Sequence, residues 1–449
     1  MQQTKEKEEG RRSSRGFYIL VGVLLAVVAV GTYAWSVQLR NGLVVSNMRD
    51  VVSWGLYISL FAWFVGVSAG GLIVSSAAAV FRIKQWQPIA KIANFVAAVV
   101  IAVAAFSILP DLGRPDRILN LFLYPNLTSP LIWDVTIIFT YLIISLVELG
   151  LLISAENERE KGNESRYLFR ERIVRGLAFV ALPVAVLTHS ITAWIFGLQI
   201  SRPLWNTALL APLFLASALV SGLGLVILVT VLGNRFASFK VEKETIAGLA
   251  RLLGVIILVD LFLLASEYVT VVWPGSPTEV SPFVVEFFGP YGWLAWTQWA
   301  FAALAFVIVA VPRFRASMLP VTLASLLVLL EVFFYRLELI IPAFVNPLVQ
   351  YPPGTSIGTS TGGSSALNGI GTIYNPGFSF QLVGSYFPSA YEWSIAMGIV
   401  ALAALLIVVG IHFLPIKPAG EASSYSGSAG GATLTRATND QPRPSDAGH

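Results

Sequence analysis

Several ionisable side chains lie inside long apolar stretches of this chain, where a charge needs a partner, water or a function. They are Asp134, Glu148, His189, Asp260, Glu267, Glu331, Arg336, Glu338 and His412. A charge in the hydrocarbon of a membrane is costly, so each is a candidate functional residue. Most belong to the half of the membrane that faces away from both chain ends, here called the outer half. Acids and a histidine in that position suit proton exchange with a small carrier.

Each candidate also has a structural reading. His189 could serve as a hydrogen-bonding residue within the helix bundle. For Glu331 and Arg336 we favour a structural ion pair between the two side chains. Asp260 and Glu267 are harder to explain in this way, because they share one helix face and no cation lies near them in sequence. We expect these two acids to be proton relays, with Glu148 continuing toward the other side of the membrane.

The chain has no cysteine and only three histidines, His189, His412 and His449. Without cysteine it forms no disulfide, and it supplies no thiolate ligands for an iron–sulfur cluster. No two of the histidines are expected at the same depth, so a pair of axial ligands for a membrane haem is missing. The prediction is a chain with no metal site, no haem and no iron–sulfur cluster of its own.

The composition identifies the elements that must position these residues. Of the 449 residues 56% are hydrophobic and 12% charged, with a mean hydropathy of +0.74. Soluble domains carry about twice that charge, so we predict an all-α, polytopic membrane protein. Apolar runs long enough to span a bilayer predict ten helices, at residues 17–37, 54–81, 89–109, 133–155, 173–200, 209–232, 246–273, 291–311, 317–340 and 392–414.

A weak internal similarity suggests how the helices are grouped. Residues 64–71 in the second span (FVGVSAGG) resemble residues 215–222 in the sixth (LASALVSG). Small residues allow close helix approach in lipid, so generic packing would also explain the match. A duplication predicts two four-helix bundles, spans 2–5 and spans 6–9, with helices 1 and 10 flanking them.

The distribution of basic residues predicts the orientation. Of the 29 Lys and Arg residues, 23 lie on the side of the two chain ends. The six exceptions are Arg40, Arg49, Arg114, Arg117, Arg202 and Arg336. This bias predicts a multi-pass protein of the cell membrane with both termini in the cytoplasm, and it indicates no nucleic-acid partner. The transmembrane domain is expected at residues 16–415, between disordered segments at 1–15 and 416–449.

Three outer segments, residues 110–131, 274–290 and 341–391, are long. The last is rich in Gly, Ser, Thr and Pro but also contains Tyr and Phe residues. Aromatic residues are enriched at protein interfaces, so this segment either docks a partner or caps the bundle.

Motifs distributed along the chain carry a family resemblance. They are WGLY (54–57), GVSAGG (66–71), DLGRPDR (111–117), TSPLIWD (128–134), HS (189–190), RPLWN (202–206), SEY (266–268), RLE (336–338) and YFPS (386–389). In their order and spacing they resemble the NrfD/PsrC family of polysulfide reductase-type membrane subunits. The likeness covers about residues 47–415, and within the family it resembles the ten-span branch of hydrogenase and alternative complex III membrane subunits.

The resemblance implies a membrane anchor that binds quinone or quinol, of the menaquinone type or another, near the outer face. It also implies two partners on that face, a ferredoxin-like iron–sulfur subunit and a large catalytic subunit, often a molybdopterin enzyme. The chain itself would then take part in quinone redox chemistry only.

The residues expected at the quinone are His189, Asp134, Trp54, Tyr57, Trp133, Asp111 and Arg114. The first two are proton partners. The three aromatic residues form ring walls, or anchor the chain at the membrane interface. Asp111 and Arg114 lie at the pocket mouth, or hold the shape of their loop. The family often has His where this chain has Asn206, so the role of His189 is inferred from this residue itself.

Two other functions remain open. A proton-coupled secondary transporter could use the same acids, although such proteins often break helices at matching positions in two halves. Here Pro183 lies deep in a span without a clear counterpart. A purely structural anchor would bind its partner and leave the quinone chemistry elsewhere.

Overall fold

The computed structural model describes residues 2–49, 52–237, 239–275, 277–345 and 386–416, and these ranges contain helices and no strand. Ten helices are long and apolar enough to cross a membrane, which confirms the predicted number. They are α1 (Gln2–Asn41), α2 (Leu56–Val80), α3 (Gln87–Ser107), α5 (Pro130–Glu160), α6 (Glu164–Gly197), α7 (Leu210–Phe236), α8 (Lys243–Val272), α10 (Gly292–Ala310), α12 (Met318–Val345) and α13 (Ala390–Phe413).

The remaining elements are short. Three further α-helices are α4 (Asn120–Leu123), α9 (Pro277–Phe288) and α11 (Pro312–Arg315). Four single 3₁₀ turns are η1 (Leu43–Val45), η2 (Lys84–Trp86), η3 (Leu109–Asp111) and η4 (Pro115–Arg117). Most of the aromatic outer segment and the C-terminal tail, residues 346–385 and 417–449, lie outside the described residues.

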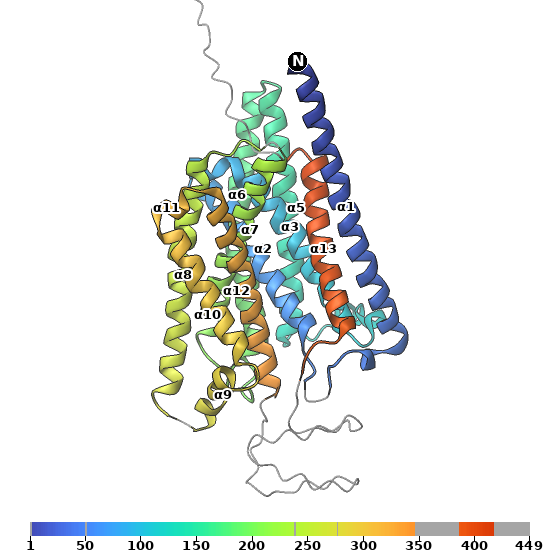
Figure 1. Cartoon of the computed structure of the whole chain (residues 1–449), viewed down its shortest axis with the longest axis vertical. Coiled ribbons are helices and arrows are strands. Elements are labelled where there is room, and N and C mark those ends of the chain that lie inside the picture. The colour runs from blue at the N-terminus through green and yellow to red at the C-terminus, as the bar shows by residue number, and fades with distance from the viewer. Residues whose placement is uncertain (1, 50–51, 238, 276, 346–385, 417–449) are drawn as a thin grey trace, which may run out of the picture. The chain divides into compact units, whose positions relative to one another are not determined.

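The long helices form the two predicted four-helix bundles (Figure 1). In the first bundle α2 packs on α3, α3 on α5, α5 on α6 and α6 on α2. In the second bundle α7 packs on α8, α8 on α10, α10 on α12 and α12 on α7. Helices α1 and α13 pack on one another and flank the first bundle through α3 and α2.

The two similar segments meet where the bundles join. The backbones of Gly70 of α2 and Gly222 of α7 are in direct contact, so a Cβ atom built on Gly70 would overlap the Gly222 Cα atom. Gly71 packs closely on α3, where its Cβ would lie 2.5 Å from the Ala93 carbonyl oxygen. Small residues therefore bring α2 against α3 and α7 at the same level.

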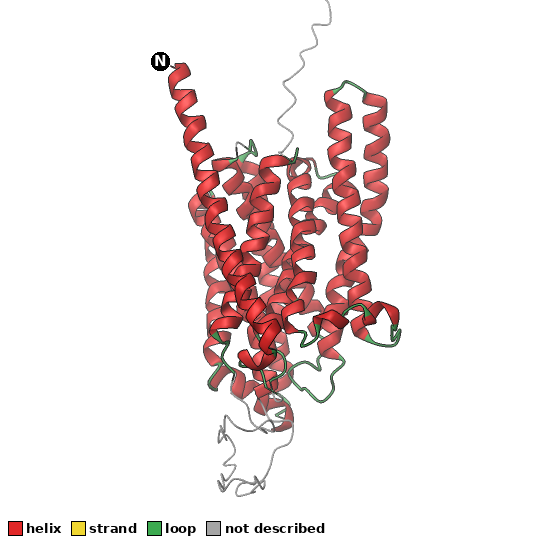
Figure 2. Cartoon of the chain, turned by 90° about the vertical axis from the view of Figure 1, so that its right-hand side faces the viewer, coloured by secondary structure: helices red, strands yellow, loops and turns green. Residues whose placement is uncertain are grey.

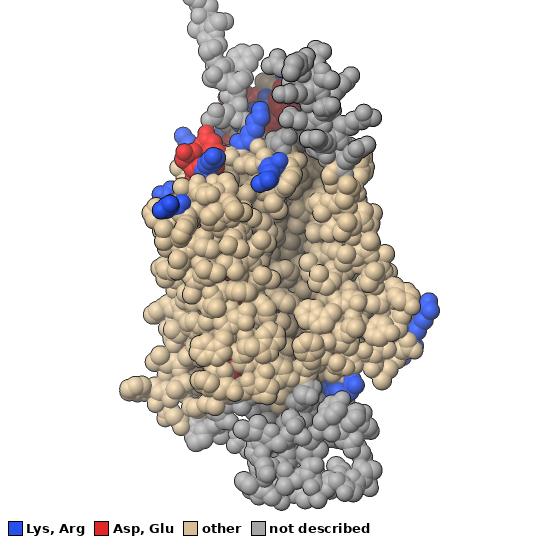
Figure 3. Space-filling view, in the orientation of Figure 1, with Lys and Arg blue, Asp and Glu red and all other residues tan. Residues whose placement is uncertain are grey.

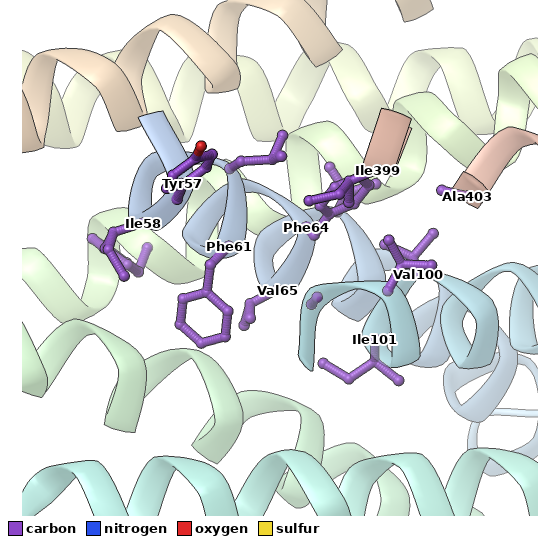
Figure 4. Close-up of a cluster of buried hydrophobic side chains, with 14 of the residues drawn as sticks. Tyr57, Ile58, Phe61, Phe64, Val65, Val100, Ile101, Ile399 and Ala403 are labelled. Atoms are coloured by element: carbon purple, nitrogen blue, oxygen red, sulfur yellow. The ribbon is translucent and has the colours of Figure 1, made fainter. Parts of the chain in front are cut away.

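Helix α2 is the centre of the molecule. It is apolar around its whole circumference, as expected for a helix surrounded by others. Figure 4 shows Tyr57, Phe61 and Phe64 of this helix among Val100 of α3 and Ile399 of α13. Helix α2 thus contacts both bundles and α13 of the flanking pair.

Helices α5 and α6 extend well beyond a bilayer. With 31 and 34 residues they are roughly 47 and 51 Å long, against a hydrocarbon thickness of about 30 Å. Their connecting end projects on the same side as the N-terminal end of α1 (Figure 2). In Figure 3, Lys, Arg, Asp and Glu gather at that end of the molecule, and a wide belt without charged residues follows.

Candidate functional site

A buried acid and a threonine hydroxyl meet between α5 and α6, one helical turn from a buried histidine. The Asp134 Oδ1 atom of α5 accepts a 2.5 Å hydrogen bond from the Thr192 hydroxyl of α6. His189 lies one helical turn before Thr192 on the same buried face, and it is 1% exposed. Among the described residues, its Nε2 atom has no hydrogen-bond partner. His189 and Asp134, both predicted as proton partners of a quinone, are thus linked through α6 by Thr192, a residue that the sequence analysis did not single out.

Four aromatic rings lie together near the outer end of α6, and we call them the aromatic roof: Trp54, Phe196, Trp205 and Phe344. Their centroids lie 5.3–5.9 Å apart, and Trp54 stacks on Trp205. The Trp205 indole donates a 2.7 Å hydrogen bond to the Leu339 carbonyl of α12, which ties the roof to the second bundle. Phe196 follows His189 by two turns of α6, a spacing that could have pointed to it.

Three acids gather in the outer half of the second bundle. Glu267 of α8, Glu338 of α12 and Glu286 of α9 line one cavity together with Tyr268 and Tyr335. It leaves about 20 Å³ for the centre of a water molecule, which is room for roughly one water. The arrangement supports proton exchange among carboxyls.

Glu286 was not among the predicted site residues. It lies in the outer segment 274–290, where α9 folds back on α8, α10 and α12 and buries the side chain. Burial raises the pKa of the Glu286 carboxyl above its usual range, because the charged form loses its hydration. An acid within the apolar run VVEFF was the one signal in the sequence that could have indicated it.

Asp260 and Glu331 lie deeper in the second bundle, near Arg336. All three side chains are buried, yet no carboxylate of the described residues lies within 4.0 Å of the Arg336 guanidinium. The expected Glu331–Arg336 ion pair is therefore absent. Instead, the Arg336 Nη2 atom donates a 2.8 Å hydrogen bond to the Ser217 hydroxyl of α7.

Glu148 is the third predicted relay, and it belongs to the other bundle. The Ser75 hydroxyl of α2 donates a 3.0 Å hydrogen bond to its Oε1 atom, while Oε2 has no partner among the described residues. Glu148 is thus separated by helix packing from Asp260 and Glu267, which both lie on α8.

Tyr57 and Asp111 lie on the side of the flanking helices. The Tyr57 hydroxyl donates a 2.6 Å hydrogen bond to the Gln38 side chain of α1, and Gln38 donates to the Pro110 carbonyl next to Asp111. The Tyr57 hydroxyl is therefore directed toward α1, and not toward α6 with His189.

Trp133 and Arg114 lie at the surface. Trp133 is 40% exposed, and its indole donates a 2.7 Å hydrogen bond to the Leu127 carbonyl. Arg114 is exposed and pairs with Asp116 at 3.0 Å, and this hydrogen bond lowers the pKa of the Asp116 carboxyl. Both residues support the shape of the outer loop between α3 and α5.

The YFPS motif connects the start of α2 to the start of α13 at the outer ends of these helices. The Tyr386 hydroxyl accepts a 2.9 Å hydrogen bond from the Leu56 amide and donates one of 2.5 Å to Glu392. Its ring occupies the space beside Gly55, where a Cβ atom would overlap it. Glu392 also completes a capping box with Ser389 at the start of α13. Tyr386 thus holds the residues next to Trp54 in position.

Comparisons with known proteins agree with this architecture. The model of the family described as "Polysulphide reductase, NrfD" matches residues 44–347. A protein of Halobacterium salinarum, provisionally named as the membrane subunit of a dimethyl sulfoxide reductase, is 34% identical over 425 residues, covering 92% of this chain and 94% of the relative.

Two further relatives are also membrane or complex subunits by name. An Hdr-like menaquinol oxidoreductase integral membrane subunit of Archaeoglobus fulgidus is 30% identical, over 90% of this chain and 94% of its own length. A selenate reductase subunit of Mesobacillus selenatarsenatis is 26% identical, over 88% and 93%. With the ten helices, the two bundles and these matches, the chain belongs to the NrfD polysulphide reductase family of membrane subunits.

Proposed function

We propose that this chain is the quinone- or quinol-reactive membrane subunit of a respiratory oxidoreductase complex. In this proposal it exchanges electrons on its outer face with a docked ferredoxin-like iron–sulfur subunit, which serves a large catalytic subunit, of the molybdopterin type. The names of the relatives support the proposal, since one is a menaquinol oxidoreductase membrane subunit and others are subunits of reductases.

One observation carries the proposal: His189 is buried one helical turn before Thr192, which bonds Asp134, and its Nε2 atom has no partner within the described part of the chain. A buried polar atom without a partner is costly, so it persists where a ligand or water completes it. A quinone oxygen would satisfy Nε2, and the aromatic roof presents flat apolar walls of the kind that enclose a ring. The residues therefore fit a quinone head group.

A bound quinone supplies a two-electron redox change that takes up or releases two protons. His189 can give a proton to, or take one from, a quinone oxygen at Nε2, since an imidazole nitrogen can act as either proton donor or acceptor. Asp134 can exchange the second proton, and Thr192 orients it. The aromatic roof would exclude water from the outer side.

Electrons would pass at the outer face. The chain has no cysteine to hold an iron–sulfur cluster, so such a cluster would be carried by the partner. The roof lies at the outer ends of α6 and α12, which keeps the site close to a subunit docked there. The positive-inside bias supports placing this face outside the cytoplasm, with both termini in the cytoplasm.

Protons would move through the buried acids. Glu267 and its neighbours line a cavity with room for water, and Asp260 lies about two turns further in. Glu148 provides a separate acceptor in the first bundle. These acids are the proposed proton relays.

The test is quinol-linked turnover of the purified whole complex. His189→Gln is expected to reduce turnover by about 100-fold or more, the range for losing a general acid–base group, while assembly with the partner subunits is unchanged. His412→Gln is the matched control, since His412 stacks on Phe17 far along α13 from the roof. Full turnover in His189→Gln would support a structural anchor, and proton-coupled solute uptake without quinone activity would support a transporter.

A further inference from the structure

Three buried acids line one small cavity in the outer half of the second bundle. They are Glu267 of α8, Glu286 of α9 and Glu338 of α12, and the rings of Tyr268 and Tyr335 lie beside them. The three acids are 8%, 7% and 1% exposed. Both carboxyl oxygens of Glu338 and the Oε2 atom of Glu286 have no hydrogen-bond partner among the described residues. Buried polar atoms are rarely left unpaired in a folded protein, so we expect the cavity to hold a molecule that bonds to them.

The size and the lining of the cavity identify that molecule as water. About 20 Å³ is available to the centre of a water molecule, which is room for one, and the acids supply the polar partners that it needs. No Lys, Arg or His of the described residues forms an ion pair with any of the three carboxyls. The same part of the chain contains no group of three or more His, Asp or Glu side chains spaced to hold a metal ion. Without a counter-charge, three carboxyls in a cavity of this size cannot all be ionised, so at least one keeps its proton.

Helix α9 closes the cavity toward the outer face, where it packs on α8, α10 and α12 (Figure 1). The Trp296 indole of α10 donates a 3.1 Å hydrogen bond to the Phe287 carbonyl, and a Cβ atom on Gly292 would overlap the same carbonyl oxygen. The rings of Phe287 and Tyr268 meet edge to face, with 4.7 Å between their centroids. These contacts hold the end of α9 so that Glu286 faces the cavity and the acids are shielded from bulk water.

The cavity adjoins the aromatic roof. Leu204 and Leu339 line the cavity on this side. Leu204 directly precedes Trp205 of the roof, and the Leu339 carbonyl accepts the hydrogen bond of the Trp205 indole. The three acids therefore lie behind the roof on the side of the second bundle, next to the ring walls that the proposed function gives to the quinone.

We propose that Glu267, Glu286 and Glu338 form a shared-proton site around one water molecule, beside the quinone pocket. A protonated carboxyl donates its hydrogen to an ionised neighbour, directly or through the water, so the proton belongs to the cluster and not to one acid. The site can take up a proton that quinol releases, or return one when quinone is reduced. This inference deepens the proposed proton relay by assigning Glu286 and Glu338 to it, and its use in turnover rests on the proposed quinone function.

The experiment is infrared spectroscopy of the purified whole complex at neutral pH, where a protonated carboxyl gives a C=O stretching band that an ionised one lacks. The spectrum of Glu286→Gln is expected to lose one such band and to show shifts in those that remain, because the other two acids lose a shared partner. Glu267→Gln and Glu338→Gln should act in the same way. Glu158→Gln is the matched control, since Glu158 is 5% exposed but has a cationic partner, Arg170, at 3.5 Å. This control should leave the bands of protonated carboxyls unchanged.

Two results would overturn the shared-proton site. In one, each variant loses only its own band and the other bands do not move; in the other, none of the three variants changes the bands of protonated carboxyls. If one variant does not assemble, the other two decide, because each acid should affect both of the others. Shifted bands together with full turnover in His189→Gln would reject the quinone pocket and keep the shared-proton site. Independent bands with an inactive His189→Gln would reject the shared-proton site alone.

Discussion

The hydroxyl of Thr192 donates a 2.5 Å hydrogen bond to the Asp134 carboxyl, and so joins α6 to α5 beside His189. The Thr188 carbonyl one turn earlier lies 2.8 Å from the same hydroxyl oxygen and shares its single hydrogen. This short, buried hydrogen bond fixes the orientation of the Asp134 carboxyl. No cation among the described residues pairs with that carboxyl.

Thr192→Val keeps the shape of the side chain and removes this hydrogen bond. We expect quinone-linked turnover to fall by about tenfold, because the freed Asp134 loses its orientation and a buried acceptor loses its donor. Thr188→Val is the matched control, since among the described residues the Thr188 hydroxyl bonds only to the Val184 carbonyl of its own helix. Equal turnover in the two variants would contradict a role for the Thr192–Asp134 contact.

Gly70→Ala is expected to destabilise the junction of the bundles. An added methyl group would collide with the Gly222 backbone, and overpacking of this kind costs about 1–3 kcal/mol. The thermal unfolding midpoint in detergent should therefore fall. Gly150→Ala on α5, where nothing lies within 4 Å of the new methyl, is the control and should not fall. A Gly70→Ala midpoint equal to that of the control would show that the close crossing is absent.

Tyr386→Phe tests the tie at the outer ends. The change leaves the Leu56 amide and the Glu392 carboxyl without their shared partner, at a cost of about 1–3 kcal/mol. Because Trp54 lies two residues before Leu56, the Michaelis constant for quinol should also rise. Tyr391→Phe, at a 40% exposed tyrosine, serves as the control. A lower unfolding midpoint with an unchanged Michaelis constant would limit Tyr386 to a structural role.

The pH dependence of stability should reveal Glu286. Burial raises the pKa of this carboxyl, so the folded state keeps the proton after the unfolded chain has lost it. The resulting stabilisation is complete below the ordinary glutamate pKa of about 4.3 and is lost as pH rises through the raised value. Wild-type protein should therefore lose thermal stability with rising pH more steeply than Glu286→Gln.

The comparison uses one measurement on three proteins. Unfolding midpoints are recorded from acidic to alkaline pH for wild type, Glu286→Gln and the control Glu244→Gln, an exposed acid on α8. The control should follow the wild-type curve. Parallel curves for wild type and Glu286→Gln would mean that Glu286 titrates as an ordinary acid.

Local composition was enough to predict the helices and their grouping. Apolar runs of bilayer length determine spans, because every backbone polar group in lipid must bond within its own helix. The similar segments at 64–71 and 215–222 predicted two bundles, and small residues such as Gly70 and Gly222 do bring those bundles into contact. The candidate functional residues could also be predicted, because a histidine or an acid within an apolar run is costly to place in the membrane.

Which candidates share a site depended on tertiary packing. Rotation about each helix axis is set by contacts across the bundle, and sequence distance does not report it. This packing brings Thr192 to Asp134, turns Tyr57 toward Gln38, and folds α9 back so that Glu286 joins Glu267. Glu331 and Arg336 do not pair for a local reason, since five residues on one helix place side chains about 140° apart around its axis.

The number of spans could be predicted from the sequence, whereas the set of residues that share a site could not. Ten spans can be predicted because each apolar run of bilayer length forms a helix in lipid, whichever helices it later packs against. A site follows from side chains of different helices meeting at one depth and one angle. The sequence by itself therefore determined that this chain is a two-bundle membrane protein with buried acids and one outer histidine. Only the tertiary structure decided which of them meet, because that depends on how close Gly66, Gly70 and Gly222 allow the bundles to come.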